Sequence, residues 1–192
     1  MKTYLLVGKT GVGKSSFVNA TFGSKVAKVN PYRACTKHVE FYPEATEFGE
    51  ICLIDSPGLA ESKGDFDSQY LDLLKTRLHG ISLEATLYVT PLKETRFALE
   101  DMQTLERITS GLGAAIWYHS WLVFTFAANV PTEERTELVV DLHRQIHTFL
   151  WKTARPQGYI KQFRGFRQVL VVDNKIANWD EGCKPLACFL GN

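Results

Sequence analysis

Long apolar runs and cysteine pairs are both missing from this chain. No stretch approaches the roughly 20 consecutive apolar residues of a membrane-spanning helix, and the first residues resemble a strand and a loop, not a signal peptide. The four cysteines form no CxxC pair and have no zinc-ligand spacing. Reduced thiols in a cytoplasmic protein are therefore expected; a Cys183–Cys188 disulfide is the alternative.

Acidic residues are absent from two parts of the chain. None precedes Glu40, and this first part carries Lys2, Lys9, Lys14, Lys25, Lys28, Arg33 and Lys37. A basic block of this kind suits a site for phosphate anions. None occurs from Leu142 to Val172 either, a basic stretch interleaved with aromatic residues. We interpret it as a solvated helix end and loop, with a patch for an acidic partner, a lipid surface or RNA as the alternative; nucleic acid is not the expected partner.

Length and hydrophobic periodicity predict one α/β domain. With 192 residues, 45% apolar and 22% charged, the chain can bury a single core, and we assign residues 1–192 to one domain. Six apolar strands alternate with amphipathic helices, which predicts a mainly parallel six-stranded sheet covered by helices on both faces. The strands are Tyr4–Gly8, Val39–Tyr42, Ile51–Asp55, Ala85–Thr90, Trp121–Phe126 and Val169–Asp173; the helices are 16–22, Phe66–His79, Phe97–Ser110 and Thr132–Trp151. Ligands of such sheets bind at the carboxyl ends of the strands.

A phosphate-binding loop, GKTGVGKS, lies between the first strand and the first helix. Its glycines allow successive N–H groups to converge on phosphate oxygens, and the following helix directs its positive end at them. Lys14 is expected to reach the β- and γ-phosphates, and the Ser15 hydroxyl to bind Mg²⁺. The predicted nucleotide-binding residues here are Gly8, Lys9, Thr10, Gly11, Val12, Gly13, Lys14, Ser15 and Ser16. The alternative is a glycine-rich turn that binds nothing.

A second motif, DSPG, ends the third strand about forty residues later. Asp55 is expected to hold Mg²⁺ through water, and the Gly58 N–H to sense the γ-phosphate; an ordinary turn is the alternative. Between the motifs, Thr36 is the candidate switch threonine, with its hydroxyl on Mg²⁺, although a loop threonine with no such role remains open. The predicted metal ligands are thus Ser15, Thr36 and Asp55.

Two groups that many GTPases use are missing. The water-orienting glutamine that follows DxxG is replaced by Leu59, which predicts slow intrinsic hydrolysis. No NKxD motif follows the fifth strand, although selecting guanine calls for a carboxylate acceptor. We expect Asp173 to accept from guanine, with Phe126, Asn129 and Asn174 lining the base pocket; an Asx turn at Asp173 is the alternative.

The segments GKTGVGKSSFVNATFG, IDSPGL, ATLYVTPLKETRFALED and TFA…VVDN resemble the septin-like GTPases of the avirulence-induced-gene type. That group contains the immunity-associated GTPases and the chloroplast import receptors. The resemblance covers about residues 2–180 and implies a P-loop NTPase fold, Mg²⁺, and bound GTP or GDP. Phe126 departs from it, since relatives often have a polar base-contacting residue there.

The resemblance also implies nucleotide-dependent homodimers that pair across their nucleotide faces. Arg96 would then reach the partner's phosphates, and it joins Lys14 and Thr36 as a candidate catalytic residue; a surface arginine that caps a helix is the alternative. A slow GTPase switch is the favoured function. A non-hydrolysing, septin-like scaffold is the alternative, and an ATP-dependent kinase or RNA-associated factor has less support. Several relatives carry membrane tails, so the cytosolic face of a membrane is the second candidate location.

Overall fold

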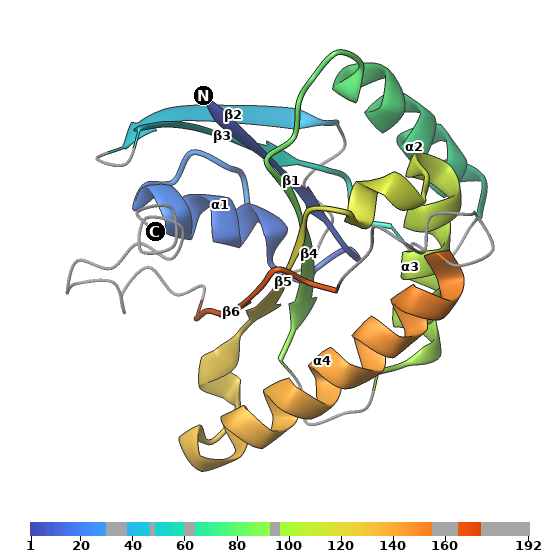
Figure 1. The fold of residues 1–192 in the computed structure, drawn as a ribbon. Helices are drawn as coiled ribbons and strands as arrows, with labels where there is room; N and C mark the ends of the chain where they lie inside the picture. Colours follow the sequence, from blue (N-terminus) through green and yellow to red (C-terminus); the bar gives the residue numbers. More distant parts are fainter. Residues whose placement is uncertain (30–37, 47–48, 60–63, 93–96, 155–164, 174–192) are drawn as a thin grey trace.

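The part of the chain that a computed structural model describes contains six strands and four α-helices (Figure 1). They alternate, except that the second and third strands are consecutive. The structure describes residues 1–29, 38–46, 49–59, 64–92, 97–154 and 165–173, with the backbone alone at 64–68. The strands are β1 (Lys2–Val7), β2 (Glu40–Thr46), β3 (Gly49–Asp55), β4 (Ala85–Pro91), β5 (Ser120–Thr125) and β6 (Gln168–Val171). The helices are α1 (Lys14–Phe22), α2 (Gly64–Leu78), α3 (Leu99–Leu112) and α4 (Thr132–Ala154). Two short 3₁₀ turns, η1 (Ala114–Trp117) and η2 (Ala127–Asn129), flank β5 and had not been predicted.

The strands form one sheet in the order β2-β3-β1-β4-β5-β6. Every neighbouring pair is parallel except β2 and β3, which are antiparallel. The predicted architecture, a mainly parallel six-stranded sheet of the P-loop NTPase type, is therefore confirmed. The carboxyl ends of β1, β3, β4, β5 and β6 all lie at one edge of the sheet, and the predicted site residues follow them.

Side chains that alternate along the central strands fill two cores. On β1, Leu5 and Val7 face the core built with α2, α3 and α4. Tyr4 and Leu6 face the opposite core, to which α1 contributes Phe17 among others. Figure 1 shows this three-layer arrangement, with α1 on one face of the sheet and α2, α3 and α4 on the other. Because β1 is buried on both faces, its residues 4–7 form a continuous apolar run, as in most central parallel strands.

None of the helices within the described residues is both long and apolar enough to span a membrane.

Candidate nucleotide-binding site

The loop between β1 and α1 has the backbone that its glycines allow. Gly8, Gly11 and Gly13 have φ angles of 150°, 76° and 93°, values that L side chains disfavour. A Cβ on Gly8 would lie 2.3 Å from the Val89 carbonyl oxygen, so the loop also passes β4 too closely for a side chain. Helix α1 begins at Lys14, directly after the loop. The N–H groups at the N-terminus of this helix lie at the same edge of the sheet.

Lys14 folds back over its own loop. Its Nζ donates hydrogen bonds to the carbonyl oxygens of Gly8 (3.1 Å) and Lys9 (2.8 Å), and the residue is only 6% exposed. A buried ammonium is costly unless it is hydrogen-bonded, so these carbonyls hold the charge inside the loop. The Lys14 ammonium therefore lies at the loop that would bind the phosphate oxygens.

Ser15 and Asp55, the predicted metal ligands within the described residues, are in direct contact. The Ser15 hydroxyl donates to Asp55 Oδ2 at 2.6 Å, although the residues are 40 apart in sequence. Asp55 ends β3 and is fully buried. A hydroxyl and a carboxylate together are hard oxygen ligands, which Mg²⁺ prefers. The donor set thus fits the magnesium that the sequence predicts.

The segment after Asp55 lies directly against the P-loop. Leu59 N–H donates to the Gly8 carbonyl, and Thr10 N–H donates to the Leu59 carbonyl, both at 3.3 Å. Gly58 has no room for a side chain, because a Cβ would lie 2.4 Å from Thr10 Cα. A movement of Gly58 would therefore displace the backbone of the phosphate-binding loop at Thr10.

Leu59 points away from the site. Its side chain is 5% exposed and belongs to the core that includes Leu71 and Ile108. The sequence predicts that this residue cannot polarise water. The structure adds the reason for its apolar character, since Leu59 anchors the segment to the core beneath α2 and α3.

Two of the predicted base-pocket residues, Phe126 and Asp173, lie where β5 and β6 end. Val172 N–H donates to the Phe124 carbonyl (2.8 Å), and Ala127 N–H donates to the Val172 carbonyl (3.2 Å). These bonds place half-buried Phe126 beside half-buried Asp173, while Asn129 is exposed at the end of η2. Phe126 has φ 57°, and no other non-glycine residue in the described parts of the chain has a positive φ. A left-handed backbone at a bulky residue stores strain, which often marks a functional position.

Sequence reasoning missed Thr125 as a site residue. It ends β5, is fully buried, and its hydroxyl donates to the Val12 carbonyl oxygen at 2.6 Å. This bond ties the middle of the P-loop to the strand that precedes the base pocket. The signal available in the sequence was a threonine at the carboxyl end of a buried strand.

Replacing Thr125 by valine is expected to lower the free energy of unfolding by about 2 kcal/mol, because the buried Val12 carbonyl loses its partner. Thermal denaturation measures the change. Thr76→Val is the matched control: the Thr76 hydroxyl also donates to a carbonyl, but it is exposed on α2, where water replaces it. Equal melting temperatures for the two variants would contradict the anchoring role.

Three predicted site residues, Thr36, Arg96 and Asn174, lie outside the described residues. Of the others, the structure brings Gly8, Lys14, Ser15, Asp55 and Gly58 together, and gathers Phe126 and Asp173 at the neighbouring strand ends. The Lys9 side chain extends away from the site and forms an ion pair with Asp101 on α3.

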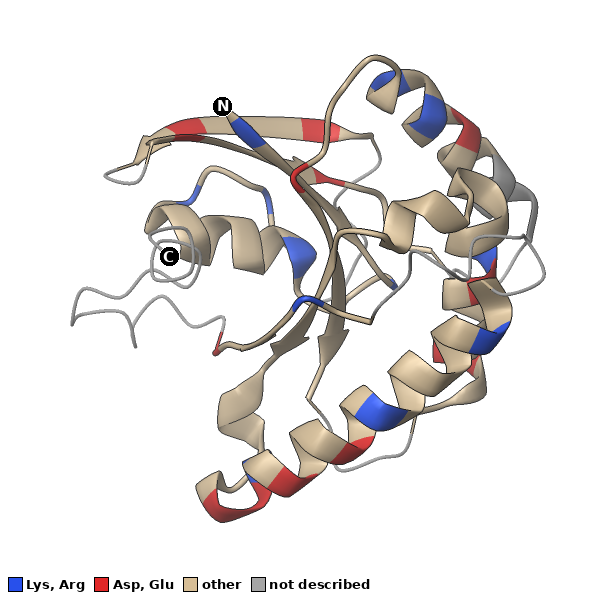
Figure 2. Cartoon of the chain, in the orientation of Figure 1, with Lys and Arg blue, Asp and Glu red and all other residues tan. Residues whose placement is uncertain are grey.

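The basic stretch from Leu142 to Val172 does not form a single patch where the structure describes it. Figure 2 shows its basic residues on α4 with acidic residues among those that precede them on the helix. Arg144 pairs with Asp141 at 3.3 Å. Two of its aromatic residues pack inward, Phe149 against Phe97 and Phe166 against His143. In the described part of the stretch, these contacts agree with a solvated helix end.

His143 and His147 stack on α4 with ring centroids 5.9 Å apart. Burial, and secondly the neighbouring imidazole, lower the pKa of His143. No group of three metal-ligating side chains occurs in the parts of the chain that the structure describes. Two imidazoles alone fall short of the three or four ligands of protein zinc sites, so we interpret the pair as part of a helix flank.

Comparison with known proteins matches the chain to one sequence family. The sequence model of the AIG1 family matches residues 2–155. Translocase of chloroplast 33 from Arabidopsis thaliana is 36% identical over 132 residues, which are 69% of this chain and 44% of that protein. The chain spans less than half the length of the first curated relatives that it matches.

Solved structures of the same group are similar as well. Toc33 from Arabidopsis thaliana in complex with GDP and Mg²⁺ has a TM-score of 0.71 and 29% identity, covering 91% of this chain and 71% of that one. A second structure has a TM-score of 0.77 and 28% identity, covering 91% of this chain and 70% of that one. It concerns the chloroplast translocon components atToc33 and psToc159, for whose GTPase activity dimerisation is important.

Proposed function

Because the chain belongs to the AIG1 family, we propose that it is a guanine-nucleotide-binding switch protein that slowly hydrolyses GTP to GDP and phosphate. The observation that carries the proposal is the Ser15–Asp55 hydrogen bond beneath the glycine-rich loop, with the buried Lys14 ammonium beside it. This arrangement joins a phosphate cradle to an oxygen donor pair for Mg²⁺. Residues 1–192 would form one GTPase domain.

The hydroxyls of Ser15 and Thr36 would bind Mg²⁺, and Asp55 would hold it through water. The metal would supply positive charge against the β- and γ-phosphate oxygens. Lys14 would neutralise the same oxygens, and the N–H groups of residues 9–16 would surround them. The Gly58 N–H would reach the γ-phosphate, and its contact with Thr10 would carry the loss of that phosphate to the P-loop.

The position of Leu59 supports the slow hydrolysis that we propose. Its side chain is buried in the core and supplies no polar group to orient an attacking water. Another group or a partner must then provide this function. The resemblance gives Arg96 a different role, in which it would neutralise charge on the partner's phosphates across a homodimer.

Base selectivity tests the nucleotide class. Asp173→Asn is expected to reduce the preference for GTP over ATP about 10- to 100-fold, because one hydrogen-bonded carboxylate is worth about 1.5–3 kcal/mol. Competition of each nucleotide against a fluorescent GDP analogue measures this preference. Asp141→Asn on exposed α4 is the control and should change nothing. Equal affinity of the wild-type protein for ATP and GTP would refute the guanine proposal.

Dimerisation separates the switch from the alternative, a nucleotide-stabilised scaffold. A switch activated by pairing should show multiple-turnover hydrolysis whose specific rate rises with protein concentration, whereas a scaffold should assemble without turnover. Arg96→Ala is expected to weaken nucleotide-dependent pairing, seen as a lower mass with a GTP analogue. If Arg96→Ala leaves both pairing and turnover unchanged, its role is disproved.

The cytoplasm, including the cytosolic face of a membrane, is the proposed location. It agrees with a nucleotide site that would draw on the cytosolic pool of GTP and Mg²⁺.

A further inference from the structure

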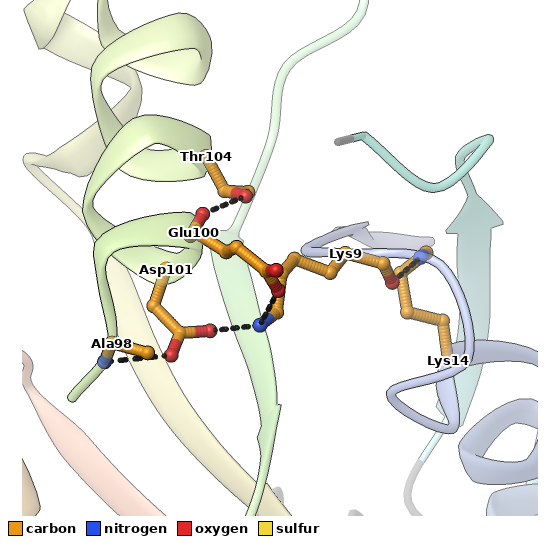
Figure 3. Close-up of polar contacts among 6 residues, drawn as sticks. All are labelled: Lys9, Lys14, Ala98, Glu100, Asp101 and Thr104. Carbon is orange, nitrogen blue, oxygen red and sulfur yellow. Dashed lines mark hydrogen bonds and ion pairs between the residues drawn. The ribbon is translucent and has the colours of Figure 1, made fainter. Parts of the chain in front are cut away.

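Lys9 belongs to the P-loop, but its side chain crosses to α3. Figure 3 shows it extending away from Lys14 toward the first turn of the helix. The Lys9 Nζ lies 2.6 Å from Asp101 Oδ1 and 3.6 Å from Glu100 Oε2. The two lysines of the loop thus point in different directions, Lys14 over the loop itself and Lys9 toward a separate helix.

Asp101 uses both of its carboxylate oxygens. Oδ1 contacts Lys9, and Oδ2 accepts a hydrogen bond from the Ala98 N–H at 3.1 Å. The second bond caps the N-terminus of α3, where an acidic side chain is also favoured by the helix dipole. The hydrogen bond from Ala98 therefore restrains the orientation of the Asp101 carboxylate independently of Lys9.

The Lys9–Asp101 pair is largely shielded from solvent. Both side chains are 15% exposed, whereas Glu100 is 78% exposed. The pair lines a cavity of about 110 Å³ whose other walls include Phe97, Phe124 and Ile146. Ion pairs in such surroundings are screened less than surface pairs, so this contact is stronger than an exposed salt bridge.

We propose that Asp101 is a positioning residue for nucleotide binding, which acts on the P-loop through the Lys9 ammonium. The inference rests on the proposed function, since it concerns how tightly the same loop holds its nucleotide.

The Lys9 peptide connects the pair to the phosphate site. Its carbonyl oxygen accepts from the Lys14 ammonium at 2.8 Å. The next residue, Thr10, binds the Leu59 carbonyl and packs on Gly58. Fixing the Lys9 side chain to α3 therefore restrains the carbonyl that holds Lys14 and the backbone that contacts Gly58. Without Asp101, the loop has more conformations to lose when it closes on phosphates.

A double-mutant cycle tests this role with Lys9→Gln, Asp101→Asn and the double variant. Asparagine keeps an amide oxygen that can cap Ala98, so the Asp101→Asn change removes the charge and leaves the cap. Each single variant is expected to release a fluorescent GDP analogue about tenfold faster than wild type, and the double variant no faster than either single one. Glu100→Gln is the matched control on the same turn, and its release rate should equal that of wild type.

Amide hydrogen exchange of the nucleotide-free proteins gives a second readout, which does not need a ligand. Residues 8–13 are expected to exchange faster in Asp101→Asn than in Glu100→Gln, while the interior of α3 is unchanged. Independent, multiplying effects of the two single changes on GDP release would overturn the proposal. So would unchanged exchange in the loop. If wild-type protein binds no guanine nucleotide, the proposed function fails, and the exchange experiment still decides whether Asp101 positions the loop.

Discussion

Replacing Lys14 by methionine should lower the affinity for GDP and for GTP at least about 100-fold. Each hydrogen bond between the ammonium and a phosphate oxygen is worth about 1.5–3 kcal/mol, and two such bonds exceed the 2.7 kcal/mol or so of a 100-fold change. Titration with a fluorescent nucleotide analogue measures the loss. Lys25→Met, at an exposed position beyond α1, is the control and should bind like wild type.

The same variant has a much smaller effect on the nucleotide-free protein. Methionine removes a buried charge, whose desolvation is costly, but it also takes a hydrogen-bond donor from the Gly8 and Lys9 carbonyls. Because these two effects oppose each other, Lys14→Met without nucleotide is expected to melt close to the wild-type temperature. A variant that binds GDP normally would disprove the role of the loop; one that melts well below wild type would leave a folding defect as the cause of lost binding.

Replacing Gly8 by alanine should destabilise the fold by about 3 kcal/mol, which is roughly 6–12 °C in melting temperature for a chain of this size. The added Cβ would lie 2.3 Å from the Val89 carbonyl oxygen, a backbone atom that moves only if β4 moves. Thermal denaturation measures the loss, and nucleotide binding should fall with it.

Gly11→Ala is the matched control in the same loop. Gly11 also has a positive φ, 76°, but a Cβ there would have no neighbour within 4 Å. Only the conformational penalty remains, about 1–2 kcal/mol. If Gly11→Ala destabilised the protein as much as Gly8→Ala, backbone conformation, and not the close approach of β4, would explain the requirement for glycine.

The chain order of the strands and the identity of the P-loop could be predicted because both depend on local patterns. An apolar run such as Tyr4–Val7, followed by glycines at fixed spacing, predicts a strand and a phosphate loop from adjacent residues alone. Ser15 and Asp55 were predicted separately as magnesium residues from their motifs, and the direct hydrogen bond between them is an addition of the structure.

Other features depend on tertiary packing and left no local signal. In the sequence, Leu59 stands out because it replaces a water-orienting glutamine. Its role in anchoring the segment to the core is visible only in the packed structure. Lys9 was expected near phosphate, yet its side chain is bound by Asp101 from a helix that begins ninety residues later. The left-handed Phe126 was also invisible, because a bulky residue is a poor sequence indicator of a positive φ.

During synthesis, the hydrogen bond between Thr125 and Val12 can form only after the chain has been made as far as β5. It joins residues 113 apart, a distance that a ribosome covers in roughly 6–23 s at 5–20 residues per second. β1 emerges first, but its partners β3 and β4 emerge later, and the strand that carries Thr125 later still. A nucleotide stabilises only a chain that can bind it. Under the proposed function, the growing chain would therefore lack the stabilisation that its nucleotide gives until β5 has left the ribosome.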